Sequence, residues 1–331
     1  MEGINHHFGQ RRLRSSPQIR ELSASIHLSH KSFIQPLFVN EDLTQPAPIK
    51  ALNGMQSDTQ DSVLQTIQND LANGITKFLL FPVPAKKAIE DFDFSFAVKT
   101  AETIKHAFGE QIWLAVDLCL CSYTTHGHCG ILNEKQTKLL NNETVEILSK
   151  YAFQLATVGV DCIAPSDMMD GRIAAIRSAL NDSSFDHVGI MSYAAKFSSQ
   201  FYGPFRDACN STPNSAGLTN RKTYQISPTN LGDAIASSLR DDKEGADILM
   251  IKPAALYTDV IAALRSRSSK PLAAYHVSGE YASIENMVQL GFMERREAHL
   301  EVWTALMRSG ANMIISYAAR NAKAWIDEMA Y

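Results

Sequence analysis

The stretch EGADILMIKPA (residues 244–254) decides the fold, because it holds one whole junction between a helix and a strand. Gly245 follows a helical pattern, and glycine readily takes the left-handed conformation that ends a helix. The residues that follow are mostly apolar, as in a strand buried on both faces of a parallel sheet. The run closes on a polar residue, Lys252. Helix, glycine, apolar strand and polar end together predict one βα unit.

The same order recurs along the chain, with Gly74, Gly159 and Gly310 each placed just before an apolar run. Eight runs are expected to be strands, at residues 33–39, 75–83, 112–121, 160–167, 187–195, 246–254, 270–279 and 311–319. Eight such units predict an α/β fold, a closed (β/α)8 TIM barrel over residues 33–331. An open doubly wound sheet stays an alternative, because strand count does not prove closure. No Gly-x-Gly-x-x-Gly follows the first run, which weakens the dinucleotide-binding form of that alternative.

The composition excludes several classes of protein. The 331 residues carry 31 Lys+Arg against 35 Asp+Glu, a net charge of −4, so a strongly basic nucleic-acid binder is excluded. The apolar stretches fall far short of the ~20 residues needed to cross a bilayer. Five cysteines in a chain of this length do not make a disulfide scaffold. We expect a soluble, cytoplasmic protein that binds neither nucleic acid nor membranes.

Residues 1–32 precede the first expected strand and carry Arg11, Arg12 and Arg14. This composition suits an extended N-terminal arm that lies on another surface. A frayed, solvated terminus is the alternative, and the bare sequence does not separate the two.

Reactive residue types gather where the expected strands end. In TIM barrels the chemistry sits at this C-terminal face of the strands. The residues expected there are Asp117, Cys119, Cys121, Ser166, Asp167, Lys196, Lys252, Ser278 and Tyr317.

Two lysines stand at neighbouring strand ends, each after an apolar run. Burial, or a second cation nearby, disfavours the charged form of lysine and lowers its pKa. The neutral amine can then attack a ketone and form a Schiff base. The alternative is that Lys196 and Lys252 simply pair with carboxylates at the rim.

The third strand runs into a loop, DLCLCSYTTHGHCG (117–130), with three cysteines: Cys119, Cys121 and Cys129. Three thiolates can converge on one soft cation, and three protein ligands with an open fourth position are the catalytic zinc pattern. His126 and His128 are candidate ligands or general bases, or else loop residues bonded to the backbone.

Two further segments carry candidate polar groups. SDMMDGR (166–172) places Ser166, Asp167 and Asp170 at a strand-to-helix turn, where they could move protons or cap the next helix. A long stretch, 197–225, is expected to be irregular and to form a lid. Its Arg206 and Arg221 suit a substrate carboxylate, or are ordinary surface charge.

Six motifs, in their order along the chain, resemble the porphobilinogen synthase (5-aminolevulinate dehydratase) family: DLCLCSYTTHGHCG, APSDMMDGR, YAAKFSSQFYGPFRDA, EGADILMIKP, VSGEYA and ISYAA. The resemblance extends from about residue 11 to the C-terminus. It implies a lyase that condenses two molecules of 5-aminolevulinate to porphobilinogen with loss of two waters, in tetrapyrrole and heme biosynthesis. It also implies a homo-oligomer, typically an octamer, in which the arm embraces a neighbouring subunit.

The resemblance also assigns roles to the lysines and the carboxylate-binding residues. Lys252 matches the lysine that forms a Schiff base with the first substrate, and Lys196 matches the second lysine. The hydroxyls of Ser278 and Tyr317 match those that bind the first carboxylate. Arg206 and Arg221 match the two arginines that bind the carboxylate of the second substrate.

The metal roles follow in the same way. The three cysteines match the Zn2+ ligands of zinc-dependent members. Asp117, Ser166 and Asp167 are the candidates for proton transfer. Asp233 lies where many bacterial members carry a glutamate for an allosteric Mg2+, and the shorter carboxylate leaves magnesium activation undecided.

Two rival functions remain to be separated from this one. A class I aldolase on the same barrel needs one lysine and no thiolate metal site. A non-catalytic metal-binding or scaffolding protein would use the cysteines as a thiol trap and would not need Lys252.

Overall fold

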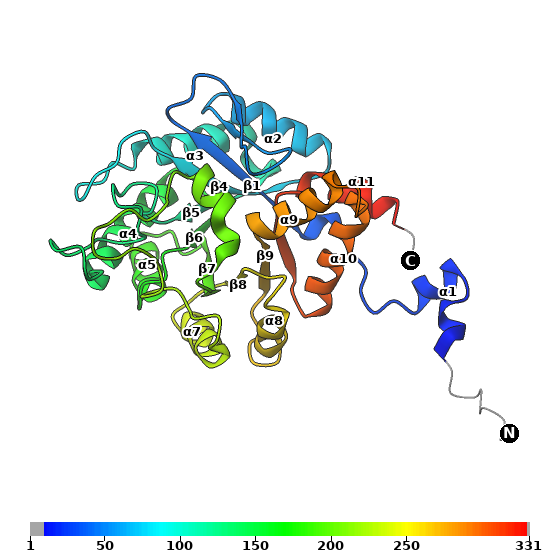
Figure 1. Ribbon diagram of the computed structural model, residues 1–331. Helices are drawn as coiled ribbons and strands as arrows, with labels where there is room; N and C mark the ends of the chain where they lie inside the picture. Colours follow the sequence, from blue (N-terminus) through cyan, green and yellow to red (C-terminus); the bar gives the residue numbers. More distant parts are fainter. Residues whose placement is uncertain (1–9, 330–331) are drawn as a thin grey trace.

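Eight parallel strands form a closed barrel in the computed structural model, which describes residues 10–329 (Figure 1). The strands are β1 (Phe33–Asn40), β4 (Lys77–Val83), β5 (Trp113–Leu118), β6 (Cys162–Pro165), β7 (Gly189–Lys196), β8 (Ile248–Lys252), β9 (Leu272–His276) and β10 (Met313–Ser316). Each pairs with the next in parallel, and Phe33 of β1 pairs with Ile314 of β10. This last pairing closes the sheet, so the predicted TIM barrel is confirmed and the open sheet is excluded.

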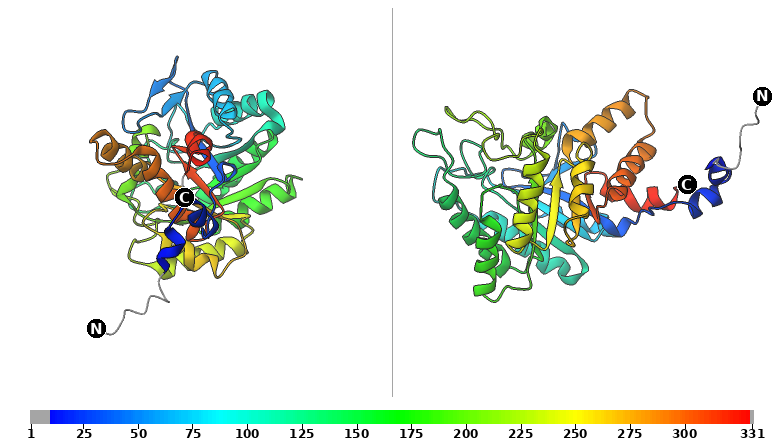
Figure 2. Two further views of the ribbon diagram at one scale, coloured as in Figure 1. Left: turned by 90° about the vertical axis from the view of Figure 1, so that its right-hand side faces the viewer. Right: turned by 90° about the horizontal axis from the view of Figure 1, so that it is seen from below.

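Helices cover the outside of the barrel (Figure 2). They are α2 (Ser62–Ala72), α3 (Ser95–Phe108), α4 (Asn141–Thr157), α5 (Arg172–Asp182), α7 (Leu231–Lys243), α8 (Thr258–Arg265), α9 (Ser278–Gln289), α10 (Arg295–Arg308) and α11 (Ala322–Asp327). Several of them pack apolar side chains on the strands, as Trp303 of α10 does on Phe33 of β1, with ring centroids 4.5 Å apart. Gly245 follows α7 with φ +104°, the left-handed conformation expected of it.

Two features differ from the sequence prediction. A small hairpin, β2 (Ala47–Pro48) with β3 (Gln56–Asp58), extends the sheet beyond β1. The stretch 197–225 is not irregular throughout, because it contains η5 (Gln200–Tyr202) and α6 (Gly203–Ala208). Pro204 lies in the first turn of α6, where its missing N–H costs no hydrogen bond, and Phe205 is buried. The prediction of irregular structure is therefore wrong for residues 200–208.

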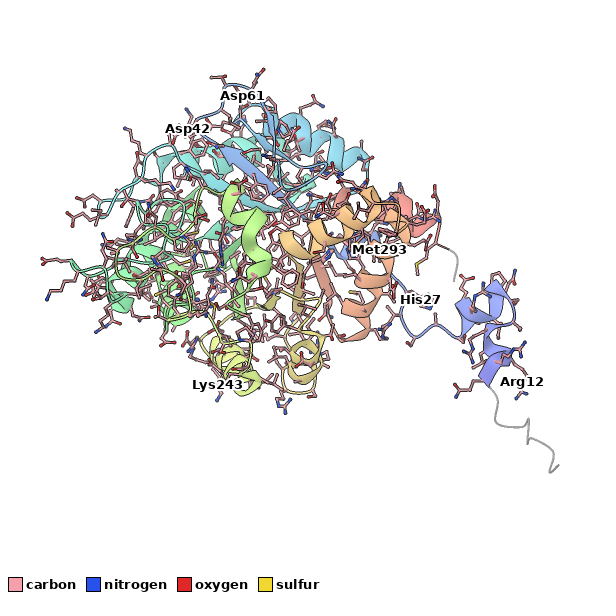
Figure 3. All side chains as sticks on the ribbon, viewed as in Figure 1. Arg12, His27, Asp42, Asp61, Lys243 and Met293 are labelled. Atoms are coloured by element: carbon pink, nitrogen blue, oxygen red, sulfur yellow. The ribbon has the colours of Figure 1, made fainter. Side chains whose placement is uncertain are left out.

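The segment before β1 lies outside the barrel. It holds η2 (Gln10–Arg14), α1 (Pro17–Leu22) and η3 (His30–Ser32), and α1 projects away from the helix layer near the C-terminal end (Figures 1 and 2). Figure 3 shows Arg12 far out on this segment, with His27 nearer the barrel. Leu22 is 82% exposed. Residues 1–9, the rest of the expected arm, lie outside the described residues.

Within residues 10–329, the helices are too short or too polar to cross a bilayer.

Candidate active site

Lys196 and Lys252 are the last residues of β7 and β8 and are direct partners in the parallel register. The register shifts just before them: Ser192 pairs with Leu249, but Ala195 pairs with Ile251, so β7 holds one extra residue. Ser192 faces the helix layer, where Arg172 Nη2 donates to its Oγ at 3.2 Å. Side chains alternate along a regular strand, so if β7 were regular, Lys196 would face the helices as Ser192 does, because the two are four residues apart. The shift turns Lys196 to the interior face that Lys252 occupies.

Lys252 lies in a cage of aromatic rings. Its Nζ is 4.2 Å from the ring centroid of Tyr275, 4.6 Å from that of Phe205 and 5.0 Å from that of Tyr193. Burial, and secondly the charge of Lys196, lower the pKa of Lys252 to about 7. A large fraction of this amine is therefore neutral near pH 7 and able to act as a nucleophile.

Lys196 and Asp117 also lie in the barrel mouth, the C-terminal end of the strands where Lys252 lies. Lys196 Nζ donates a hydrogen bond to the carbonyl oxygen of Ser166 and lies 5.4 Å from the ring centroid of Tyr193. Asp117, on β5, has a buried Oδ1 without a hydrogen-bond partner in the described chain. Burial raises its pKa, and the charges of the two lysines oppose that rise. Asp117 is placed to hold or release a proton beside both amines.

Tyr193 lies between the two lysines, and the sequence reasoning missed it. Its ring centroid is within 5.4 Å of both Nζ atoms, and its buried hydroxyl interacts with the carboxyl group of Asp117. Tyr193 is three residues from Lys196, a spacing that puts side chains on opposite faces of a regular strand. Only the register shift in β7 brings them together.

Asp167 lies in a different environment from the one expected. Its Oδ1 accepts the N–H of Met169 at 2.7 Å, and its Oδ2 is 3.5 Å from Nε of Arg172. Arg172 is fully buried and also pairs with Asp241 of α7 at 2.9 Å. Burial raises the pKa of Asp167 to about 6, against the lowering effect of Arg172. The structure thus places Asp167 in a buried ion network, while neighbouring Ser166 contacts Lys196 through its carbonyl.

The three cysteines converge just beyond the end of β5. The Sγ atoms of Cys119, Cys121 and Cys129 all lie within 4.8 Å of one another, and all three residues are buried. Hydrogen bonds from the other two thiols hold the pKa of Cys129 well below its usual range. A compact set of three soft donors fits a thiophilic cation such as zinc, with a fourth position left for another ligand.

The two histidines of this loop are not part of the metal cluster found among the described residues. His128 uses its ring nitrogens on the hydroxyl of Tyr224 at 3.0 Å and the carbonyl of Leu218 at 2.8 Å. His126 Nδ1 accepts the N–H of His128 at 3.1 Å. These bonds attach the cysteine loop to the segment that follows α6.

The segment 197–225 lies over the mouth and brings in both arginines. Arg206 Nη2 donates to the carbonyl of Ser199 at 3.2 Å, and Arg221 Nη2 donates to the carbonyls of Gly127 and Ser211 at 2.9 and 2.6 Å. Each Nε is buried without a hydrogen-bond partner in the described residues. Burial, and secondly the charge of Arg221, lower the pKa of Arg206. Two neighbouring guanidinium groups with free donors can hold a carboxylate.

Ser278 and Tyr317 lie on the β9–β10 side of the mouth. Ser278 Oγ accepts the N–H of Phe205 at 3.1 Å and donates to the carbonyl of Phe201 at 3.2 Å, so it contacts the lid. The Tyr317 hydroxyl is 3.2 Å from that of Tyr275, whose ring packs on Lys252.

The mouth is closed in this structure. A cavity between Asp117, Cys119, Cys121 and Phe205 has a volume of about 10 Å³, room for about one water molecule. A cavity of about 590 Å³ lies on the outer side of the lid, beside Gln225 and Asp233, and neither lysine lines it. Lys196 and Lys252 are both buried in this closed arrangement, 5% and 3% exposed.

Comparison with known proteins identifies the family. The family model described as delta-aminolevulinic acid dehydratase matches residues 8–325. The delta-aminolevulinic acid dehydratase of Bacillus subtilis (strain 168) is 38% identical over 99% of both chains. That of Methanothermobacter thermautotrophicus is 40% identical over 93% of this chain and 94% of its own.

A solved structure agrees with the sequence relatives. The delta-aminolevulinic acid dehydratase (porphobilinogen synthase) of Toxoplasma gondii ME49, in complex with the reaction product porphobilinogen, superimposes with a TM-score of 0.92 at 35% identity. The match covers 97% of this chain and 92% of that one. The chain belongs to the delta-aminolevulinic acid dehydratase family.

Proposed function

We propose that this chain is a lyase that condenses two molecules of 5-aminolevulinate to porphobilinogen, in the heme and tetrapyrrole pathway. The observation that carries the proposal is the pair Lys196 and Lys252, aligned at adjacent strand ends on one face of the barrel. A reaction between two keto acids needs two such amines side by side, because proximity turns a bimolecular step into an intramolecular one.

Each lysine takes one substrate in the proposed reaction. The neutral amine of Lys252 attacks the ketone of the first substrate, and loss of water leaves a Schiff base. Lys196 captures the second ketone in the same way and releases the second water. One Schiff base loses a C–H proton to become an enamine, whose carbon attacks the other imine carbon and forms the C–C bond. The lysine at that carbon then leaves as an amine while the adjacent carbon loses a proton, which forms a C=C bond. The amino group of one substrate then attacks the remaining imine and frees the other lysine, so both waters are accounted for.

The groups around the lysines are proposed to transfer protons and to bind the substrate carboxylates. Asp117, with its raised pKa, is our first candidate for proton transfer, and Ser166 and Asp167 act beside it. Arg206 and Arg221 bind the carboxylate of the substrate on Lys196. The carboxylate of the substrate on Lys252 is bound by the hydroxyls of Ser278 and Tyr317.

A Zn2+ ion is the metal that the cysteine cluster fits best. Cys119, Cys121 and Cys129 would hold it, and when bound it supplies Lewis-acid polarisation of a substrate oxygen. Magnesium binding at Asp233 stays a prediction of the resemblance. Asp233 is exposed and its Oδ1 accepts the hydroxyl of Ser237 at 3.2 Å.

We further propose a cytoplasmic homo-oligomer, with the octamer as the expected size. The segment 10–32, part of the arm expected over residues 1–32, is the proposed contact. Its Leu22, Arg11, Arg12 and Arg14 are exposed.

Borohydride trapping with peptide mapping tests the function. Reduction in the presence of 5-aminolevulinate should fix substrate mass on Lys252, and Lys252→Ala should abolish both the label and porphobilinogen formation. A class I aldolase would label one lysine without forming porphobilinogen. A metal-binding protein would label neither lysine and would lose nothing on substitution of Lys252, and either result would refute the proposal.

A further inference from the structure

Glu280, in the first turn of α9, is a buried carboxylate with no cationic partner among the ion pairs of the described residues. It is 6% exposed. Its Oε2 accepts the N–H of Val277 at 2.9 Å, which caps its own helix. Its Oε1 accepts the N–H of Ala255 at 2.9 Å, which belongs to a different loop. One carboxylate therefore ties the loop after β8 to the loop after β9.

The loop that Glu280 binds, residues 253–256, comes directly after Lys252. Only Pro253 and Ala254 separate Lys252 from Ala255. Backbone N–H groups from Ala254 to Leu256 all act on the Glu280 carboxylate. The carbonyl of Lys252 is held from the opposite side by the hydroxyl of Tyr202 and the N–H of Phe197, both at 2.9 Å. The backbone of Lys252 is thus fixed between the lid and Glu280.

Capping of α9 requires the bond from Glu280 to Val277 but not the bond to Ala255. A carboxylate buried among backbone donors, without a cation, carries a desolvation cost that only several hydrogen bonds offset. Burial accordingly raises the pKa of Glu280 to about 7, although the backbone N–H groups oppose the rise. Another buried glutamate of the same helix, Glu285, has an ordinary ion pair with Arg295 at 2.8 Å.

We propose that Glu280 is a positioning residue for Lys252, fixing the 253–256 loop so that the amine meets the ketone carbon of the substrate. The inference rests on the proposed function, in which Lys252 forms the Schiff base. Small displacements matter in such a step, because a 1 Å error can cost roughly 100-fold in rate.

Glu280→Gln tests this with almost unchanged shape. Its amide NH2 group would face a backbone N–H, so one of the two loops is released. We expect the rate of borohydride labelling at Lys252, at saturating 5-aminolevulinate, to fall roughly 10- to 100-fold, with a matching fall in kcat and little change in KM. The pH midpoint of labelling should also shift, since the cage around the amine changes.

Glu285→Gln is the matched control, because Glu285 lies on the same helix but contacts Arg295 and His299. It should lower the melting temperature and leave the labelling rate and its pH midpoint unchanged. If Glu280→Gln does not fold, Glu280→Asp gives the same test: it keeps a carboxylate in the first turn of α9 but is one methylene too short to reach Ala255.

The outcomes separate the two proposals. If the wild-type enzyme is not labelled at Lys252, the proposed function fails. If the wild type is labelled, and Glu280→Gln or Glu280→Asp is labelled at the same rate with the same pH midpoint, the positioning role is refuted. A slow variant with a shifted midpoint, beside an unaffected Glu285→Gln, supports it.

Discussion

The backbone of Gly279 lies directly against the carbonyl oxygen of Phe201, so that a Cβ added at Gly279 would come within 2.6 Å of that oxygen. Gly279 is the second residue of α9, the helix that follows β9, and Phe201 belongs to η5 of the lid. Because the atom in the way is backbone, no side-chain rotation relieves the contact. The lid therefore packs on α9 at a residue where any side chain larger than that of glycine would clash with the lid backbone.

Gly279→Ala should therefore hold the lid partly open. We expect KM for 5-aminolevulinate to rise and kcat to fall, together by roughly tenfold or more in kcat/KM, with faster proteolysis between residues 197 and 225. Gly203→Ala, in α6 of the same lid, is the control, because no atom lies within 4 Å of its added Cβ. Equal kinetics and equal proteolysis in both variants would show that the close contact does not govern the lid.

The reaction should lose rate as the pH falls below neutrality. The pKa of Lys252 in the folded enzyme is about 7, below the ordinary lysine value, and the neutral amine is the reactive form. The nucleophilic fraction is thus nearly complete above pH 8 and falls tenfold per pH unit well below pH 7. The measurement is the initial rate of borohydride-trapped label at Lys252 between pH 5.5 and 9. A rate that still rises about tenfold per pH unit up to pH 9 would mean that the amine is not desolvated.

Loss of one cysteine of the cluster should abolish metal binding. Cys129→Ser removes the one thiol of the three whose pKa is lowered. We expect the wild type to bind zinc stoichiometrically and the variant to bind none detectably and to lose activity. Cys162→Ala is the control, since Cys162 is buried on β6 away from the cluster. Metal analysis after dialysis gives the readout independently of turnover. Unchanged zinc content in Cys129→Ser would rule out the proposed ligand set.

The arginine pair should affect one substrate and spare the other. Arg206→Lys loses the planar fork that binds a carboxylate through two parallel hydrogen bonds. We expect KM in the condensation to rise by roughly tenfold or more, while single-turnover labelling of Lys252 by the first substrate stays near the wild-type rate. Steady-state kinetics and trapping on the same preparation decide the matter. Equal losses in both assays would place Arg206 at the first substrate instead.

The sequence was sufficient for the barrel because the fold depends on features that are local in the chain. Apolar runs, the glycines before them and the polar strand ends are each readable within about ten residues, and the eight barrel strands, β1 and β4 to β10, follow from them. The lid was only partly readable. Its helical turns at 200–208 are too short for a periodic pattern, and they form because Tyr202 and Phe205 are buried against the mouth.

The parts of the site that escaped prediction depend on register and on distant contacts. Tyr193 stands at a spacing that normally faces away from Lys196. Glu280 reads as an ordinary first-turn acid of a helix, and its bond to Ala255 comes from a loop 25 residues away. Arg172 reads as a solvated helix residue, yet it lies fully buried between Asp167 and Asp241.

The added residue in β7 has a consequence for how such an enzyme can change. Lys196 is four residues from Ser192, a spacing that would point its side chain to the helices in a regular strand, and the bulge between them turns it to the substrates instead. If β7 lost this bulge without losing a residue, every amino acid of the catalytic list would still be in the chain, but Lys196 would face the helices and only Lys252 would face the substrates.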